Sequence, residues 1–335
     1  MTNYSIAVVI PAYNAQAYIG EALDSVSTQS RRPEQIIIVD DGSSDDTAER
    51  IREWERQYNG ELHLLQQSNQ GVSAARNTGI RYAKTDLVAL LDADDVFLPH
   101  HLEQLERAFK NHPQILLCFG DALYFDSQGM TRSSSFVGTR LETVQYSEHE
   151  DGLRLMQGSA YVSLLWGSYI APSASLFSKS AVERVGLFDE AIRSAEDRDL
   201  WLRLSRTGSF AYYPLVVARK RVHENNLTHL RYVTQTQRYQ LSVLQKMIAY
   251  AEELQLSPAE RQQTREATAE QIRNMLYTAS RKGLRHYCEA CVYLARQGVI
   301  FPLCNPKHLL RALISLRREE RDGKDRFISC CLCWW

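Results

Sequence analysis

The sequence predicts an α/β fold, with a doubly wound, mostly parallel sheet followed by a C-terminal helical appendage. Short apolar runs rich in β-branched residues alternate with amphipathic helical segments through the first part of the chain, and this alternation is typical of a parallel sheet covered by helices. From about residue 230 onward, helical periodicity dominates. The composition, 44% hydrophobic and 24% charged among 335 residues, excludes a disordered or fibrous chain.

Four apolar runs are predicted to form buried strands, at residues 6–10, 36–39, 62–65 and 87–91. Continuous runs of Val, Ile and Leu suit strands that are covered on both faces. Polar or acidic residues follow these runs, and ligands of open α/β sheets bind beyond the carboxyl ends of the strands. We therefore expect the functional residues to gather at 11–14, 40–43 and 92–95.

Apolar residues at helical spacing predict helices between these strands, at residues 18–29, 47–58, 71–84 and 100–109. A further strand is expected at 115–119. Residues 126–150 are polar and contain Gly and Ser, so they predict a loop over the sheet edge, of the kind that often serves as a lid. Mixed structure over 153–222 should end in a strand near 215–221, and 230–318 should be helical.

The charge is divided unevenly along the chain. The net charge of −1 argues against a general nucleic-acid binder. Residues 231–335 contain 17 basic and 10 acidic residues, whereas the remainder contains 22 and 30. This difference predicts two parts with different tasks, a domain over residues 1–229, with halves 1–99 and 100–229, and a helical extension over residues 230–335.

The cysteines and the hydropathy indicate the cellular location. Only Cys118 of the seven cysteines lies in the first 287 residues, which is not the pattern of a secreted disulfide framework. No signal-peptide features begin the chain, and no apolar stretch approaches the ~20 residues that span a bilayer. We therefore expect a cytoplasmic protein. The basic amphipathic segment 309–321 leaves two alternatives, peripheral contact with the inner face of the membrane or packing on the rest of the protein.

The strongest local feature is Asp92-Ala93-Asp94-Asp95, directly after the fourth apolar run. Neighbouring carboxylates repel one another unless a cation compensates. Mg²⁺ or Mn²⁺, bound by one or two carboxylates and by substrate phosphates, is a recurrent solution. The alternative is an acidic turn that caps the next helix.

Two further segments point to a nucleotide. Asp40-Asp41-Gly42-Ser43 can accept hydrogen bonds from a base or a ribose, although it also suits a turn with a helix cap. Arg76 lies near the start of a predicted helix, where the dipole does not favour a cation, so we expect it to pair with the Asp cluster, a phosphate or a base. The chain has neither a Gly-rich G-x-G-x-x-G turn nor a Walker A sequence, which disfavours a dehydrogenase and a P-loop enzyme.

Seven short segments follow one another along the chain. They are Pro11-x-Tyr13-Asn14, Asp40-Asp41-Gly42-Ser43, Asn69-x-Gly71-x-x-x-Ala75-Arg76-Asn77-x-Gly79, Asp92-x-Asp94-Asp95, Gly186-x-Phe188-Asp189-Glu190, Glu196-Asp197-x-Asp199-Leu200-Trp201 and Arg221-Val222-His223. Each segment is common by itself, but the set in this order is specific and covers residues 4–228. Together these segments resemble the family-2 glycosyltransferases, inverting enzymes of bacterial type with a GT-A fold.

For the donor, the resemblance implies a nucleotide-diphosphate sugar, with a UDP-sugar favoured, bound mainly by the half 1–99. The base and ribose should be held by Pro11, Tyr13, Asp40 and Asp41. Arg76 should lie on the base and phosphate side, and Asp92 should face the ribose or the donor sugar. Asp94 is implied to bind Mn²⁺ or Mg²⁺, and His223 to complete the metal or diphosphate site.

For the acceptor, the resemblance places Glu196 in the acceptor half, 100–229, and makes Asp197 the catalytic base. The implied acceptor is a glycan or glycolipid in polysaccharide or cell-envelope biosynthesis. A carboxylate base helps a hydroxyl to attack, and a metal neutralises the charge of the leaving diphosphate. The residues alone also allow simpler roles, since acids often begin helices and His223 could be structural.

Two competing functions follow from the same residues. A sugar nucleotidyltransferase would need a Gly-rich, basic loop after the first strand, and residues 11–16 offer neither feature. A non-catalytic nucleotide-sugar-binding scaffold is disfavoured because the chain contains Asp92, Asp94, Asp197 and His223 together. The sequence therefore predicts a hexosyl- or related transferase.

Overall fold

The computed structural model describes residues 4–126, 129, 131–223, 232–299, 307–308 and 311–312. The chain forms two compact units. The first comprises Met1–Asn226 with Ala251–Leu256, and the second comprises Leu227–Tyr250 with Ser257–Trp335. The domains expected from the sequence, 1–229 and 230–335, assign separate tasks to the two parts, and that assignment stays a prediction.

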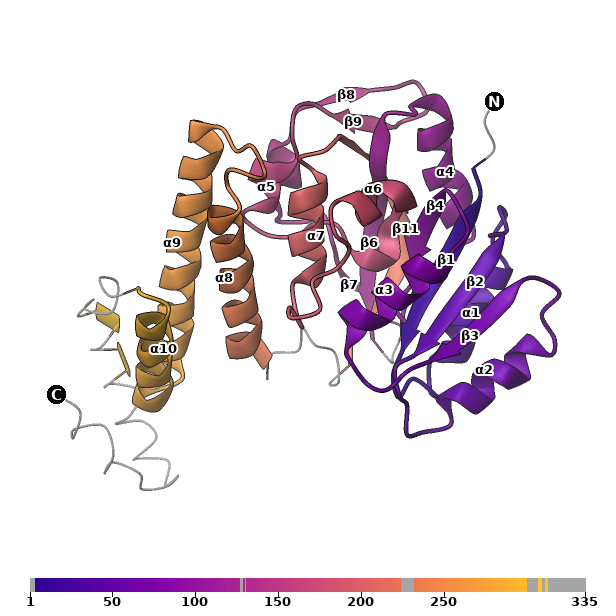
Figure 1. Ribbon diagram of the computed structural model, residues 1–335, viewed down its shortest axis with the longest axis horizontal. Helices are drawn as coiled ribbons and strands as arrows, with labels where there is room; N and C mark the ends of the chain where they lie inside the picture. Colours follow the sequence, from indigo (N-terminus) through magenta and orange to yellow (C-terminus); the bar gives the residue numbers. More distant parts are fainter. Residues whose placement is uncertain are drawn as a thin grey trace. The chain divides into compact units, whose positions relative to one another are not determined.

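One mixed sheet forms the centre of the first unit (Figure 1). Its strands follow the order β3-β2-β1-β4-β10-β6-β11-β9-β8, while β5 pairs with β11 and β7 pairs with β6. The strands are β1 (Ile6–Ala12), β2 (Gln35–Asp40), β3 (Leu62–Gln66), β4 (Leu87–Leu90), β5 (Val96–Phe97), β6 (Ile115–Phe125), β7 (Thr131–Ser134), β8 (Tyr146–Glu148), β9 (Arg154–Met156), β10 (Ser175–Ser178) and β11 (Ser209–Arg221).

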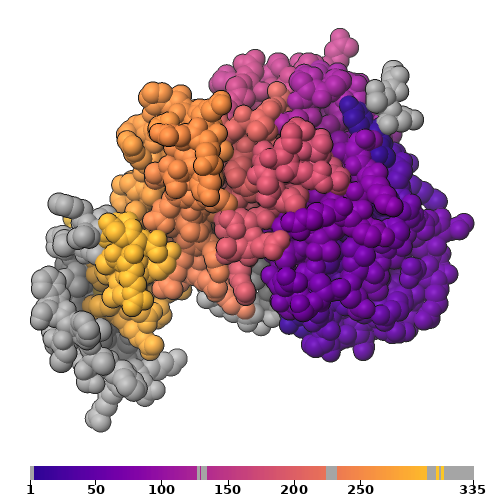
Figure 2. Space-filling model, viewed as in Figure 1, coloured from indigo at the N-terminus to yellow at the C-terminus, as the bar shows by residue number. Residues whose placement is uncertain are grey.

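The helices of this unit follow the predicted alternation. They are α1 (Ile19–Ser27), α2 (Thr47–Glu55), α3 (Val72–Tyr82), α4 (His101–Asn111), α5 (Tyr161–Leu164), α6 (Lys179–Arg184) and α7 (Glu196–Leu204), with two short 3₁₀ turns, η1 (Arg140–Thr143) and η2 (Pro172–Ala174). In the space-filling view the N-terminal third of the chain, coloured indigo to purple, forms a closely packed surface (Figure 2).

The sheet is covered on both faces, which confirms the predicted fold class. Successive side chains of a strand point to opposite faces. Val8 and Ile10 of β1 belong to a core shared with α1 and α4, whereas Val9 faces α3. A Cβ atom added at Gly79 of α3 would lie 2.4 Å from a Val9 methyl group, so only glycine permits this close helix–sheet approach.

Parallel and antiparallel pairing occur in different parts of the sheet. β3, β2, β1 and β4 are parallel neighbours. β10 then runs antiparallel between β4 and β6, and β6 and β11 are again parallel. β10 therefore joins the predicted halves 1–99 and 100–229 into one continuous sheet.

The prediction of an irregular loop over residues 126–150 is wrong in part. Residues Thr131–Ser134 form β7 against β6, and Tyr146–Glu148 form β8 against β9. Strands of three or four polar residues at a sheet edge bury little apolar surface, so they leave no hydrophobic alternation in the sequence. Similarly, β11 begins at Ser209, six residues before its predicted start.

The described part of the second unit contains the helices α8 (Val233–Ala249), α9 (Pro258–Arg281) and α10 (Leu284–Arg296). They share a core that includes Leu241, Leu276 and Leu294. A capping box of Ser257 and Glu260 starts α9. None of the helices in the described ranges is long and apolar enough to cross a membrane. Apart from 311–312, the basic segment 309–321 lies outside the described residues.

Candidate active site

The loop Asp92–Asp95 joins β4 to β5 at the carboxyl edge of the parallel strands. Ser173 Oγ donates to Asp95 Oδ2 at 2.6 Å and accepts from the Asp92 N–H at 3.1 Å. The Arg221 N–H donates to Asp95 Oδ1 at 2.9 Å. Asp95 therefore fixes the loop, while the side chains of Asp92 and Asp94 remain 21% and 25% exposed and can reach a ligand.

The crowding of carboxylates in this loop has an electrostatic cost. Burial raises the pKa of Asp95 to about 8, and the charges of Asp94 and Asp92 add to the rise, while Lys220 opposes it. A carboxylate with a raised pKa is one whose negative charge is not fully compensated. The loop is therefore a place where additional positive charge would bind favourably.

Asp94 and His223, which are 129 positions apart, meet at this loop. His223 Nε2 lies 2.8 Å from Asp94 Oδ2, and the ring of Tyr18 stacks on the imidazole with centroids 5.1 Å apart. These are the two metal ligands that the resemblance implies, and the Asp94 carboxylate is the kind of oxygen ligand that suits Mn²⁺ or Mg²⁺.

A cation at Asp94 and His223 would need further ligands. Within the described ranges no three His, Cys, Asp or Glu side chains gather in a metal-holding group. Mg²⁺-type ions are usually held by one or two carboxylates, substrate phosphates and water. The residues present therefore fit a cation that arrives with a diphosphate.

Arg76 connects the donor side of the site to the acceptor side. Its guanidinium donates to Asp92 Oδ1 and to Glu196 Oε1, at 2.6 Å in both cases. Arg76 is 2% exposed, and it lies 5.3 Å from the centroid of the Phe188 ring. The expected pairing with the Asp cluster is confirmed, and a contact between Arg76 and a nucleotide stays a prediction.

Glu196 and Asp197 open helix α7. The residue before them, Ala195, has φ 65° and ψ 22°, a left-handed conformation that is strained for alanine and that often occurs at functional sites. Asp199, the third acid, is buried and pairs with Arg203 at 2.7 Å. Asp199 is therefore structural. The expectation that these acids begin a helix is confirmed, and the roles of Glu196 and Asp197 toward an acceptor stay a prediction.

Asp197 has the properties of a proton acceptor. Burial raises the pKa of Asp197 to about 6, and the charge of Glu196 adds to the rise, while the Arg198 N–H, Arg76 and Lys220 oppose it. Ser168 Oγ lies 3.4 Å from Asp197 Oδ2. A carboxylate with a pKa near 6 is ionised at neutral pH and is a stronger base than an ordinary one.

The residues expected to hold the nucleotide base lie at the same edge. Tyr13 is 53% exposed, whereas Pro11 is buried within β1. Asp41 accepts from the N–H groups of Gln70 and Gly71 at 2.9 and 2.7 Å, and Asp40 Oδ1 accepts from the Ser43 N–H at 3.0 Å. The turn expected here is present. Contacts of these four residues with a nucleotide stay a prediction.

The sequence reasoning missed three residues at the site, Lys220, Ser173 and Ser168. The two serines contact backbone and carboxylate groups, Ser173 from the 3₁₀ turn η2 and Ser168 from a loop. Neither segment has a distinctive spacing, so no sequence signal marks them. Lys220 had a signal, because Arg219-Lys220-Arg221 places three cations at the end of a strand that points to an acidic loop.

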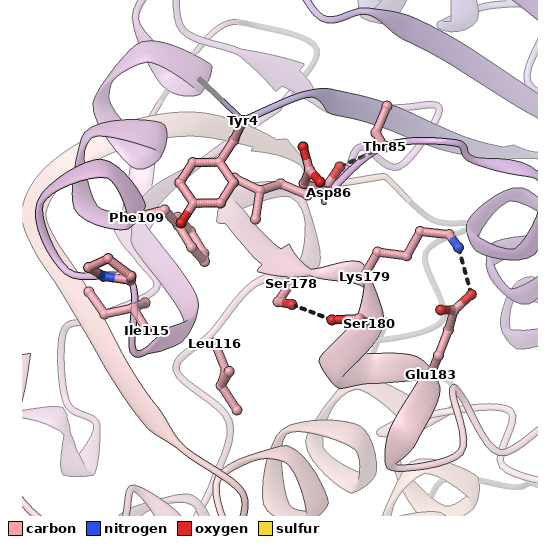
Figure 3. A pocket seen from close by; sticks show the side chains of 12 residues that line it. Tyr4, Thr85, Asp86, Phe109, Ile115, Leu116, Ser178, Lys179, Ser180 and Glu183 are labelled. Carbon is pink, nitrogen blue, oxygen red and sulfur yellow. Dashed lines mark hydrogen bonds and ion pairs between the residues drawn. The ribbon is translucent and has the colours of Figure 1, made fainter. Parts of the chain in front are cut away.

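A separate cavity of about 300 Å³ lies at the opposite edge, where the parallel strands begin (Figure 3). Its polar groups pair with their neighbours. Lys179 binds Glu183 at 2.7 Å, Ser178 Oγ lies 3.2 Å from Ser180 Oγ, and Asp86 accepts from Ser5. None of the predicted site residues lines this cavity.

The fold and the site define a GT-A-type glycosyltransferase chain, with an Asp-x-Asp loop facing a Glu-Asp pair across one edge of an α/β sheet. Residues 7–185, more than half of the chain, match the family described as glycosyl transferase family 2. The chain belongs to this family, which confirms the resemblance noted in the sequence.

Relatives of known sequence support the same assignment. An uncharacterized glycosyltransferase of Rickettsia prowazekii is 28% identical over 227 residues, which cover 67% of this chain and 66% of that protein. Chondroitin synthase of Escherichia coli is 25% identical over 221 residues, 66% of this chain and 29% of the synthase. The chain thus matches just under two thirds of the length of the Rickettsia protein and less of the synthase.

Solved structures show the same fold. Residues 1–349 of TarS from S. aureus, in complex with UDP-GlcNAc, give a TM-score of 0.62 at 15% identity and cover 98% of this chain and 94% of that one. The mannosyltransferase PcManGT from Pyrobaculum calidifontis, in complex with GDP-Man and Mn²⁺, gives 0.56 at 18% identity, with 96% and 89% covered. At these identities the likeness concerns the fold alone.

Proposed function

We propose that the chain is an inverting, metal-dependent glycosyltransferase that moves a sugar from a UDP-sugar to a hydroxyl group of a glycan or glycolipid. The observation that supports this most is the Arg76 bridge, with 2.6 Å to Asp92 and 2.6 Å to Glu196. Asp197 follows Glu196 in the chain, and the charges of Arg76 and Lys220, which both pair with Asp92, also act on Asp197. This supports a carboxylate base near the loop that would receive the diphosphate.

In the proposed reaction, the Asp197 carboxylate takes the proton of the acceptor hydroxyl while the oxygen of that hydroxyl attacks C1 of the donor sugar. The new C1–O bond forms on the face opposite the diphosphate, which leaves with the electron pair of the old C1–O bond. One base is sufficient and the anomeric centre inverts. Proton removal by a positioned carboxylate accelerates such an attack about 10²–10⁴-fold.

Asp94 and His223 would hold the Mn²⁺ or Mg²⁺ ion, which would neutralise negative charge on the departing diphosphate. The exposed ring of Tyr13 would stack on the base. TarS with UDP-GlcNAc and PcManGT with GDP-Man and Mn²⁺ support a nucleotide-sugar donor. The two donors differ in their nucleobase, which is uracil in one and guanine in the other. The relative named chondroitin synthase supports a polysaccharide acceptor.

The expected cytoplasmic location is part of the proposal.

The test is release of nucleoside diphosphate from UDP-GlcNAc, UDP-glucose and GDP-mannose, with and without Mn²⁺. We expect Mn²⁺-dependent release from a UDP-sugar, with a loss of about 100-fold or more in Asp94→Ala. Asp24→Ala, which removes an exposed carboxylate of α1 outside the site, is the control and should leave release unchanged. Binding of a sugar nucleotide without turnover would instead favour the scaffold.

A further inference from the structure

Lys220 has no part in the proposed reaction, yet its ammonium group lies beside the acidic loop. The Nζ atom is 3.9 Å from Asp92 Oδ2, and the side chain is 20% exposed. The backbone on either side of Lys220 is fixed, because Arg219 pairs with Val96 of β5 and the Arg221 N–H binds Asp95. Strand β11 therefore holds this side chain against the loop.

The neighbouring carboxylates favour the charge of Lys220. Burial works to lower the pKa of Lys220, but nearby carboxylates, Asp92 among them, raise it above its ordinary value. A lysine is already charged at neutral pH at its ordinary pKa, so the ammonium group is present there. Placing a lysine here has a desolvation cost, which the neighbouring carboxylates offset.

A fixed ammonium at this place has opposite effects on the two ligands of the site. It repels a free divalent cation that approaches Asp92 and Asp94, because like charges at short range in a partly buried site interact strongly. It attracts the diphosphate of a donor for the same reason. When cation and diphosphate bind together, the attraction to the phosphates compensates the repulsion.

We propose that Lys220 is the resident counter-cation of the Asp92–Asp95 loop and makes binding of the divalent ion depend on the donor diphosphate. Lys220 weakens binding of the ion alone and strengthens binding of the ion together with the diphosphate. The inference rests on the proposed function and adds to it that binding of the donor and binding of the ion are coupled.

The experiment measures two affinities in the full chain. The first is Mn²⁺ alone, followed by electron paramagnetic resonance of the free ion. The second is UDP at saturating Mn²⁺, followed by calorimetry. The variants are Lys220→Met, which removes the charge, Lys220→Arg, which keeps it, and Lys179→Met, a matched loss of a lysine charge at the opposite edge. Thermal melts establish that each variant is folded.

We expect Lys220→Met to bind Mn²⁺ alone at least about fivefold more tightly and UDP with Mn²⁺ at least about fivefold more weakly, as loss of one nearby charge in a partly solvated site should produce. Lys220→Arg and Lys179→Met should both resemble the wild type. If Lys220→Met does not fold, Lys220→Gln provides the same comparison.

Two results would overturn the inference, and they can be told apart. If the wild type binds UDP with Mn²⁺ and the charge-removing variant binds Mn²⁺ alone no more tightly than the wild type, the role of Lys220 is wrong and the proposed function stands. If the wild type binds neither UDP nor a UDP-sugar with Mn²⁺, the proposed function fails and the inference fails with it.

Discussion

Both edges of the sheet in the first unit present charged side chains. The contacts among these side chains differ between the two edges. At the edge where the parallel strands begin, the contacts are separate pairs, such as Lys179 with Glu183, four positions apart, and Ser5 with Asp86, 81 positions apart. At the carboxyl edge, Arg76 binds Asp92 and Glu196, and His223 binds Asp94. These contacts join segments that are 16 to 129 positions apart.

The difference shows what distinguishes an active site from a surface hollow in this molecule. The cavity in Figure 3 has volume and polar walls, but its polar groups form separate pairs, one of which reaches Ser5 outside the lining. The carboxyl edge concentrates unlike charges from several elements and leaves two acids with raised pKa values, Asp95 and Asp197. Perturbed ionisable groups of this kind are a mark of function.

The largest expected effect is at Asp197. Asp197→Asn removes the proposed base without changing its shape, so diphosphate release from the donor should fall about 10²–10⁴-fold. The melting temperature should not fall, because burial already disfavours the charged form of Asp197. Turnover within tenfold of the wild type would show that another group takes the proton.

The next effect is on stability. Arg76→Met would leave Asp92 and Glu196 without their shared cation, and removing one partner of a buried ion pair costs about 3–5 kcal/mol. Urea unfolding of the wild type and the variant measures the difference. A loss below about 1 kcal/mol would mean that the bridge contributes little to the fold and that the contrast between the edges is smaller than we infer.

A pH profile tests the role of Asp197 as proton acceptor without a substitution. Asp197 must be ionised to accept a proton, and its pKa is raised to about 6. Activity should therefore be half-maximal near that pH, approach a plateau above about pH 7 and fall to about one tenth of the plateau at about pH 5. The measurement is kcat/KM for the donor from pH 5 to 8. A profile without this acidic limb would contradict the assignment.

The smallest effect is expected at the opposite edge. Lys179→Met breaks the pair with Glu183, in which the side chains are 18% and 40% exposed, and pairs that reach solvent contribute about 0.2–1 kcal/mol. Urea unfolding should detect a change of that size, and diphosphate release should be unaffected. A loss of activity would show that the cavity in Figure 3 is coupled to the reaction.

Much of the fold could be predicted because its strands are buried on both faces. Runs such as residues 36–39 have no polar alternative, and the acids that follow them mark the ligand edge. The antiparallel strand β10 could not be placed, since Ser175–Ser178 contains only two apolar residues and its neighbours β4 and β6 are distant in sequence. Strands β7 and β8 escaped prediction because backbone pairing, and not side-chain burial, defines them.

Candidate site residues could be predicted where the proposed chemistry requires a particular residue type. They were harder to predict where only the geometry of the fold brings a residue to the site. Asp94 and His223 were expected to act together, and they lie 2.8 Å apart. The partner of Arg76 on α7 was not foreseen, because sequence spacing does not say which acid of Glu196 and Asp197 points toward the donor side. Lys220 was overlooked because a lysine at a strand end usually reaches into water.

The position of β10 has a consequence for synthesis of the chain on the ribosome. Strand β4 is complete at Leu90, but its second neighbour, β10, begins only at Ser175. At about 5–20 residues per second, the apolar edge of β4 would wait on the order of ten seconds for its partner. Unpaired apolar edges invite association with other chains, so the nascent protein should be most vulnerable to aggregation, and most dependent on chaperones, during that interval.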